Sequence, residues 1–200
     1  MNVSGTLGAL RLLYNPSAFL PHITISTFAD LPIPLRAPGS KTPIKVVVLD
    51  KDNCFAAPHT DEVWPAYAAT WSRLRAAYPG ARVLIVSNTA GSSSDHDDSQ
   101  AKRLEAATGV DVLRHHGSKK PGCGAEVLAH LREQGLAERG AEVAVVGDRL
   151  LTDVALAHSM GACSVWVRDG IVPDTSVFTR FEKMFYDYMT GAGYKARPVE

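Results

Sequence analysis

The chain has 200 residues, of which 46% are hydrophobic and 21% are charged, with 21 Lys and Arg residues balanced by 21 Asp and Glu residues. This length fits one domain with short appendages, and the composition excludes disordered, collagenous and coiled-coil proteins. A formal net charge of zero argues against nucleic acid as a partner, and no apolar run approaches the roughly 20 residues that span a bilayer.

The first 43 residues differ from the rest of the chain in proline content and charge. Half of the twelve prolines lie there, and residues 1–49 carry four basic residues against one acidic residue. The prolines between Leu31 and Pro43 exclude a continuous helix or a central strand. Four apolar residues before them recur at helical spacing: Val3, Leu7, Leu10 and Tyr14. We therefore expect residues 1–43 to form a proline-rich appendage, whose short amphipathic helix is a candidate for contact with an anionic membrane. Packing of Leu31 to Leu35 on the core is the alternative that the sequence leaves open.

From Ile44 onward, apolar runs alternate with helical patterns. The apolar runs predict strands over 44–50, 82–88, 110–115, 142–148 and 163–169. Apolar spacing predicts helices over 63–78, 102–107, 126–131 and 154–160, and a C-terminal helix from Phe178 to Tyr188. This alternation is typical of βαβ units and a parallel sheet. We expect residues 44–175 to form an α/β core of the Rossmann-like, doubly wound kind, and residues 176–200 to form a helix and tail.

Polar residues follow the predicted strands at their carboxyl ends, which is the edge where open parallel sheets bind ligands. The strand-end residues are Asp50, Asp52, Ser87, Asn88, Asp148 and Asp153, and Lys120 precedes the third helix. No requirement of the fold places four carboxylates, a hydroxyl, an amide and a lysine at one edge. These residues therefore form a candidate site.

The chemistry of these side chains points to phosphoryl transfer. The carboxylates of Asp50 and Asp52 suit the two roles of nucleophile and general acid/base, because a carboxylate accepts phosphoryl groups as an aspartyl-phosphate. The oxygens of Asp148 and Asp153 suit Mg²⁺, a hard cation that prefers such ligands. The hydroxyl, the amide and the lysine can donate hydrogen bonds to phosphoryl oxygens. The set predicts metal-assisted phosphoryl transfer.

The order of these motifs resembles a known superfamily. Asp50-x-Asp52, Ser87, Lys120 and Gly147-Asp148-x-x-x-x-Asp153 are similar to the four ordered motifs of the haloacid-dehalogenase superfamily of phosphohydrolases. A closer resemblance, to the mitochondrial phosphatidylglycerophosphate phosphatase family, spans most of the chain. It rests on the segments LRLLYNPS, DLPIPL, VVVLDKDNC, VLIVSNTAG, HHGSKKPGC and VVGDRLLTD.

The resemblance implies a role for each site residue. Asp50 is implied as the nucleophile, Asp52 as the acid and then the base, and Ser87, Asn88 and Lys120 as phosphate ligands. The implied cofactor is Mg²⁺, held by Asp50, Asp52, Asp148 and Asp153. Lys120 is preferred over Lys119 because it directly precedes Pro121 at a helix start. Asn53 stands where the superfamily more often has Thr or Val, and the role of its amide is left open.

The motif spacing bears on the substrate. Ser87 follows Asp50 by 37 residues and Lys120 follows Ser87 by 33, and a βαβ unit alone uses about 30 or more, so neither interval has room for a cap domain. An open site suits a phosphate on a protein or on a lipid at a membrane surface.

The resemblance favours the lipid. It implies a phosphoric monoester hydrolase that converts phosphatidylglycerophosphate to phosphatidylglycerol for cardiolipin synthesis. The implied location is the matrix face of the mitochondrial inner membrane, as a peripheral protein. A phosphoprotein or small-metabolite phosphatase and a non-catalytic, receiver-like phospho-acceptor are the alternatives. The sequence leaves open whether the protein forms a homo-oligomer and which acyl chains it prefers.

Overall fold

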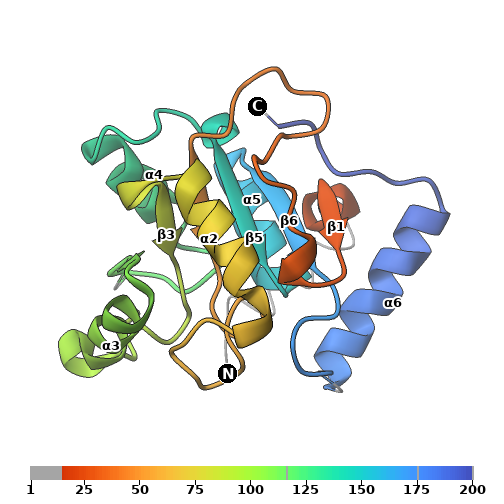
Figure 1. Ribbon diagram of the computed structural model, residues 1–200. Coiled ribbons are helices and arrows are strands. Elements are labelled where there is room, and N and C mark those ends of the chain that lie inside the picture. The colour runs from red at the N-terminus through yellow and green to blue at the C-terminus, as the bar shows by residue number, and fades with distance from the viewer. Residues whose placement is uncertain (1–14, 116, 175, 200) are drawn as a thin grey trace.

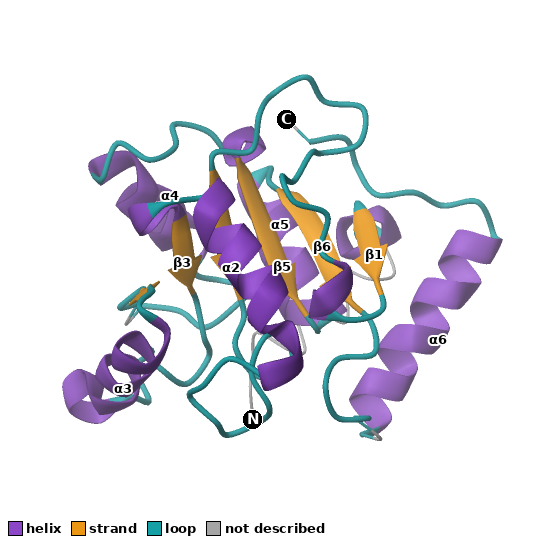
Figure 2. Ribbon diagram, viewed as in Figure 1, coloured by secondary structure: helices purple, strands orange, loops and turns teal. Residues whose placement is uncertain are grey.

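The structure is a computed structural model that describes residues 15–115, 117–174 and 176–199. The described residues form one sheet, whose strands are β1 (Ile23–Ile25), β2 (Val46–Leu49), β3 (Val83–Ile85), β4 (Asp111–Val112), β5 (Val143–Gly147) and β6 (Cys163–Val167). The strand order is β1-β6-β5-β2-β3-β4, and every neighbouring pair is parallel. Figure 2 shows the sheet at the centre of the molecule with helices around it.

Helices cover both faces of the sheet, so the prediction of a doubly wound parallel sheet is confirmed. The helices are α2 (Ala68–Ala77), α3 (Ser99–Thr108), α4 (Gly124–Glu133), α5 (Ala155–Met160) and α6 (Val177–Gly191). Figure 1 shows α2 in front of the sheet and α5 behind it. In the described residues between β2 and β4, no separate domain interrupts this arrangement, which agrees with the expected absence of a cap.

The strands are buried on both faces because successive side chains point to opposite sides of a sheet. Val47 and Leu49 of β2 pack in a cluster with side chains of α2 and α3. Val46 and Val48 pack in a second cluster with side chains of α4 and α5. A continuous run of apolar residues therefore serves two cores at once.

The N-terminal segment differs from the expected appendage. Its described part, residues 15–43, contributes β1, which pairs with β6 at the edge of the sheet. Phe28, Leu31 and Leu35 are buried in the same cluster as the strands. The prolines do exclude a long or central strand, but a three-residue edge strand fits between them. The candidate amphipathic helix with Val3, Leu7, Leu10 and Tyr14 lies outside the described residues.

Helix α6 lies along the flank of the sheet beyond β1 (Figure 1). Its side chains Phe185 and Tyr186 pack on a small cluster formed by Leu150, Val154 and Trp166. Among the described helices, none combines the length and the apolar character that crossing a membrane requires.

Candidate active site

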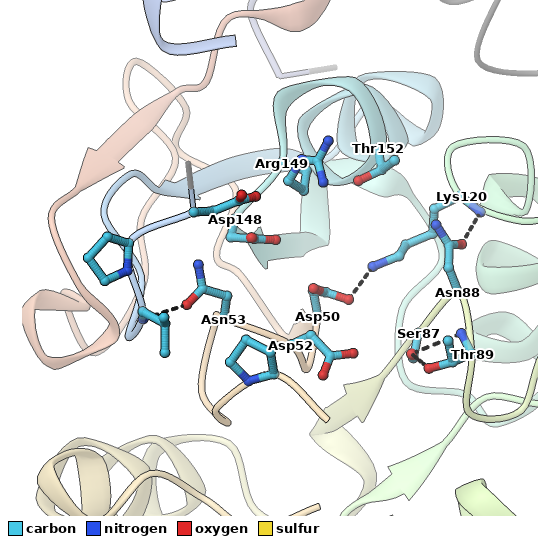
Figure 3. A pocket seen from close by; sticks show the side chains of 14 residues that line it. Asp50, Asp52, Asn53, Ser87, Asn88, Thr89, Lys120, Asp148, Arg149 and Thr152 are labelled. Carbon is cyan, nitrogen blue, oxygen red and sulfur yellow. Dashed lines mark hydrogen bonds and ion pairs between the residues drawn. The ribbon is translucent and has the colours of Figure 1, made fainter. Parts of the chain in front are cut away.

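The carboxyl ends of β2, β3 and β5 meet at one edge of the sheet and surround a cavity of about 450 Å³. Figure 3 shows its lining. Six of the predicted site residues line it: Asp50, Asp52, Ser87, Asn88, Lys120 and Asp148. Asp153 is buried next to Lys120. The structure thus brings together all the side chains that the sequence analysis selected.

Asp50 directly follows β2, and its carboxylate lies close to a buried lysine. The ammonium group of Lys120 donates to Asp50 Oδ1 at 2.5 Å and to Asp153 Oδ1 at 2.6 Å. Burial raises the pKa of Asp50 to about 6, with Lys120 lowering that pKa and the Asp153 charge adding to the rise. Burial lowers the pKa of Lys120, but the charges of Asp153 and Asp50 outweigh it and raise that pKa above its usual value. The lysine therefore stays protonated and holds Asp50 in place.

Three carboxylates of the site are close enough to share one cation. Oxygens of Asp50, Asp148 and Asp153 lie within 4.8 Å of one another. Burial, followed by the charges of Asp50 and Asp153, raises the pKa of Asp148 well above its usual value. A set that contains only carboxylate oxygens, whose mutual repulsion Arg149 and Lys120 offset in part, fits a hard divalent cation.

Asp52 does not join this group through its carboxylate, although the sequence analysis places it among the metal ligands. Its Oδ1 accepts a hydrogen bond from the His59 amide at 2.9 Å and lies 2.9 Å from the ammonium group of Lys51. The side chain still lines the cavity beside Asp50. The contacts that hold Asp52 at the cavity therefore come from its own loop.

The position of Asp153 depends on a close approach to Gly147 at the end of β5. A β-carbon on Gly147 would lie 2.3 Å from Asp153 Cγ, so any larger residue would displace that carboxylate. Asp153 lies in a π-helical turn, Leu150–Val154, which leads into α5. Such turns occur frequently at functional sites. Its Oδ2 also accepts from the Arg149 amide at 3.1 Å.

The phosphate-ligand candidates come from two neighbouring loops. Ser87 Oγ lies 3.0 Å from Thr89 Oγ1 at the end of β3, and Asn88 Oδ1 accepts from the Lys120 amide at 2.7 Å. The Asn88 amide group is then left to donate into the cavity. Lys119 points elsewhere, since its ammonium group donates to Ser94 Oγ at 2.8 Å. Of the two lysines, only Lys120 lines the cavity.

His115 connects the loop that carries Ser87 to the loop that carries Lys120. Its Nε2 lies 2.8 Å from the Ser87 carbonyl oxygen and its Nδ1 lies 2.9 Å from that of Ser118. The side chain is buried. The sequence analysis gave this histidine no role, because its contact with the Ser87 backbone, 28 residues away, leaves no pattern in the sequence.

Asn53 has a structural role that the sequence left open. It adopts a positive φ of 57°, which Asn tolerates better than most residues. Its Oδ1 accepts from the amides of Ile171 at 2.9 Å and Val172 at 2.8 Å. A β-carbon on Gly170 would lie 2.5 Å from Asn53 Nδ2, so glycine is needed for this approach. Asn53 thereby fixes the loop between β6 and α6 against the loop that follows β2 and carries Asp50 and Asp52.

Arg149 is a cavity-lining residue that the sequence analysis missed. Its Nε donates to Glu182 Oε2 of α6 at 2.9 Å, and Glu182 is buried. Glu182 Oε1 accepts from the Leu151 amide, also at 2.9 Å. Nothing in the sequence around Arg149 indicates that its partner is Glu182, 33 residues further along the chain.

The chain was compared with known proteins, and a family model described as mitochondrial PGP phosphatase matches residues 3–172. The chain belongs to the mitochondrial PGP phosphatase family. It is 51% identical over 189 residues to the mitochondrial phosphatidylglycerophosphatase GEP4 of Saccharomyces cerevisiae, covering 94% of this chain and 99% of that protein. A probable mitochondrial phosphatidylglycerophosphatase of Schizosaccharomyces pombe is 28% identical, covering 93% and 91%. The chloroplastic/mitochondrial phosphatidylglycerophosphate phosphatase 1 of Arabidopsis thaliana is 33% identical, covering 82% and 45%.

Membership in the mitochondrial PGP phosphatase family confirms the closer of the two resemblances. The protein is an enzyme of the phosphatase class, and the non-catalytic, receiver-like alternative is set aside. The family match includes every residue of the cavity named above, from Asp50 to Val172.

Proposed function

We propose that this protein hydrolyses the terminal phosphate of phosphatidylglycerophosphate, giving phosphatidylglycerol and inorganic phosphate. The proposal rests on one observation above all: the cavity that holds Asp50 beside the buried Lys120 lies in a chain that matches a named phosphatidylglycerophosphatase over nearly its full length. The product would feed cardiolipin synthesis, and the proposed location is the matrix face of the mitochondrial inner membrane.

In the first step, a carboxylate oxygen of Asp50 attacks the terminal phosphorus. A bond forms between that oxygen and phosphorus, the bond from phosphorus to the glycerol oxygen breaks, and Asp52 gives its proton to that oxygen. The products are the free lipid alcohol and an aspartyl-phosphate. The negative charge on the phosphoryl oxygens is stabilised by Lys120, Ser87 and the Asn88 amide group.

In the second step, Asp52 takes a proton from a water molecule, whose oxygen attacks the phosphorus. The bond between phosphorus and Asp50 breaks, which releases inorganic phosphate and restores the carboxylate. The hydrogen bond from the His59 amide and the ion pair with Lys51 fix the orientation of Asp52 for both transfers.

The proposed cofactor is Mg²⁺, held by Asp50, Asp148 and Asp153. When bound, Mg²⁺ supplies positive charge that offsets the charge of the carboxylates and of the phosphate. The Lys120 ammonium group pairs with the buried Asp153, so it balances part of the carboxylate charge in addition to the metal ion.

Two structural features support a lipid over a small metabolite. No separate domain covers the cavity in the described part of the chain, so a large substrate can reach it. Arg149 lines the cavity together with Lys120. A phosphatidylglycerophosphate molecule carries a phosphodiester in addition to its terminal phosphate, and a second cationic side chain suits that second anion.

The decisive experiment measures phosphate release by the full chain from phosphatidylglycerophosphate in detergent micelles. Phosphatidic acid, a phosphopeptide and a sugar phosphate serve as competing substrates at equal concentration. We expect the highest kcat/KM for phosphatidylglycerophosphate and none for the Asp50→Asn protein. Faster release from the phosphopeptide or the sugar phosphate would contradict the proposed substrate and favour the alternative phosphatases.

A further inference from the structure

We propose that the outer face of α6 is the surface by which the protein docks on the lipid bilayer that contains its substrate. This inference rests on the proposed function, because it assigns the partner that a lipid substrate requires. It names a surface different from the N-terminal helix that the sequence suggested.

The outer face of α6 is apolar although it is exposed. Five large apolar side chains lie on it: Val177, Phe178, Phe181, Met184 and Tyr188. Their exposed fractions are 81%, 69%, 42%, 63% and 72%. Residues 177, 181, 184 and 188 follow the spacing of one helical stripe, and 178 adjoins it. We call this set the α6 stripe.

The opposite face of α6 is already satisfied by the protein. Phe185 and Tyr186 pack on the cluster around Trp166, and Glu182 pairs with Arg149. Figure 1 shows that the helix lies on the flank of the molecule, with the protein on one side only. Nothing in the fold therefore requires the α6 stripe to be apolar, and contiguous exposed apolar surface of this kind marks an interaction site.

The α6 stripe continues the rim of the catalytic cavity. Val172, Pro173 and Asp174 line that cavity and lie in the loop before the helix, which begins at Val177. Val172 is itself 47% exposed, and its backbone amide donates to Asn53 Oδ1 in the loop after β2. Asp174 accepts from the Ser176 amide and from the Thr179 hydroxyl, which fixes the first turn. A membrane on the stripe would thus lie at the edge of the cavity, where a lipid phosphate must enter.

The chemistry of the face fits a bilayer interface. An amphipathic helix with aromatic residues on its apolar face lies in the boundary between headgroups and acyl chains. Three basic residues around the helix, Arg149, Arg168 and Lys183, are paired with carboxylates. Arg180, next to Phe181, is exposed and forms no ion pair with the described residues. An unpaired cation at this position suits anionic headgroups.

A second copy of the chain fits the α6 stripe less well. A stable dimer buries about 800 Å² per partner, from 20 to 30 residues on each side. The stripe has five side chains on a helix of 15 residues. A copy seated there would also lie at the rim of the cavity that must admit the substrate.

The experiment uses the full chain and vesicles of phosphatidylcholine with phosphatidylglycerol. One variant carries Phe178→Ser, Met184→Ser and Tyr188→Ser. A matched control carries Phe178→Leu, Met184→Leu and Tyr188→Leu, which keeps the face apolar. We expect the serine variant to lose vesicle binding in flotation by about tenfold or more, because three apolar side chains no longer enter the interface, and the leucine control to float like the unaltered protein. Both should hydrolyse para-nitrophenyl phosphate normally, because the cavity is unchanged.

A gain-of-signal measurement protects the test against misfolding. In a Met184→Trp protein, the added indole should be quenched by vesicles of brominated lipid. Unaltered flotation of the serine variant, equal loss in both triple variants, or no quenching would each overturn the inference. A dimer of the unaltered protein that dissociates in the serine variant, with flotation unchanged, would assign the stripe to a second copy.

Activity separates failure of this inference from failure of the proposed function. If the serine variant hydrolyses phosphatidylglycerophosphate in detergent micelles at the normal rate but loses about tenfold or more of its turnover in vesicles, both stand. If the unaltered protein hydrolyses para-nitrophenyl phosphate but not phosphatidylglycerophosphate in either form, the proposed substrate fails, whatever the flotation shows.

Discussion

Replacing Lys120 by methionine tests the electrostatic design of the site directly. The change keeps most of the length of the side chain and removes a buried ammonium group that lies 2.5 Å from Asp50 Oδ1 and 2.6 Å from Asp153 Oδ1. Removing one partner of a buried ion pair costs about 3–5 kcal/mol, because the remaining charge is left uncompensated. We therefore expect the free energy of unfolding to fall by roughly that amount at neutral pH in the metal-free protein.

The penalty of Lys120→Met should depend on pH in a defined direction. Lys120 lowers the pKa of Asp50, which is about 6 in the intact protein. Without the lysine that pKa rises further, so Asp50 is protonated at pH 5 and carries no unpaired charge. The loss of stability is thus smallest near pH 5 and grows as the pH rises above 6. Turnover should also fall by about 100-fold to 1,000-fold, as it does when a transition-state donor is removed.

Lys119→Met is the matched control, because the Lys119 ammonium group donates to Ser94 Oγ outside the cavity. Its stability should change by less than about 0.5 kcal/mol and its turnover by less than about twofold. Denaturant unfolding from pH 5 to 8 and phosphate release at neutral pH measure both variants. Equal losses in the two variants, or a Lys120→Met protein with a pH-independent penalty, would refute the reasoning.

Three further predictions follow from the site and the core. Asp50→Asn should lower turnover by several orders of magnitude, measured as phosphate release, and retention of a tenth of the activity would contradict its role as nucleophile. A chelator should abolish activity and Mg²⁺ should restore it, with Asp148→Asn raising the concentration required; full activity in chelator would contradict the proposed metal site. Burial lowers the pKa of His158 from 6.5 to about 4. The folded protein therefore binds this proton less readily than the unfolded chain, and up to about 3 kcal/mol of stability that is present above pH 6.5 is lost as the pH falls toward 4. His158→Gln keeps a donor for the Leu20 carbonyl and should flatten the unfolding free energy over that range, whereas parallel pH profiles would contradict this account.

Most of the site residues that the sequence predicted lie at or shortly after the end of an apolar run, whereas Lys120 precedes a helix. β2 and β5 are hydrogen-bonded neighbours in register, so the residues after them, Asp50 and Asp148, must approach one another. The carboxyl ends of parallel strands lie at the same edge of the sheet, so residues that follow separate strands in the sequence meet at one site. The predicted strand runs are longer than the observed strands because their last polar residues have already left the sheet.

What the sequence missed depends on contacts between distant residues. β1 has three residues, Ile23–Ile25, and pairs through its backbone with β6, about 140 residues away. The Asn53 side chain binds amides 118 and 119 residues away. Neither a short strand nor a side chain that binds backbone amides leaves a periodic signal, so the sequence predicts neither the pairing of β1 with β6 nor the role of Asn53.

Two sets of contacts join α6 and the loop before it to the edge of the sheet that carries the cavity. They explain how a helix near the C-terminus takes part in positioning the site. Asn53 holds the loop before the helix, and Glu182 holds both the Arg149 guanidinium and the Leu151 amide. A buried ion pair adds little net stability compared with apolar residues of the same size, but its geometry is specific. Here that geometry fixes the start of the π-helical turn that carries Asp153. The position of α6 and the position of the Asp153 carboxylate are therefore set by the same contacts, so a bilayer on the proposed α6 surface would rest on an element that is tied directly to the cavity.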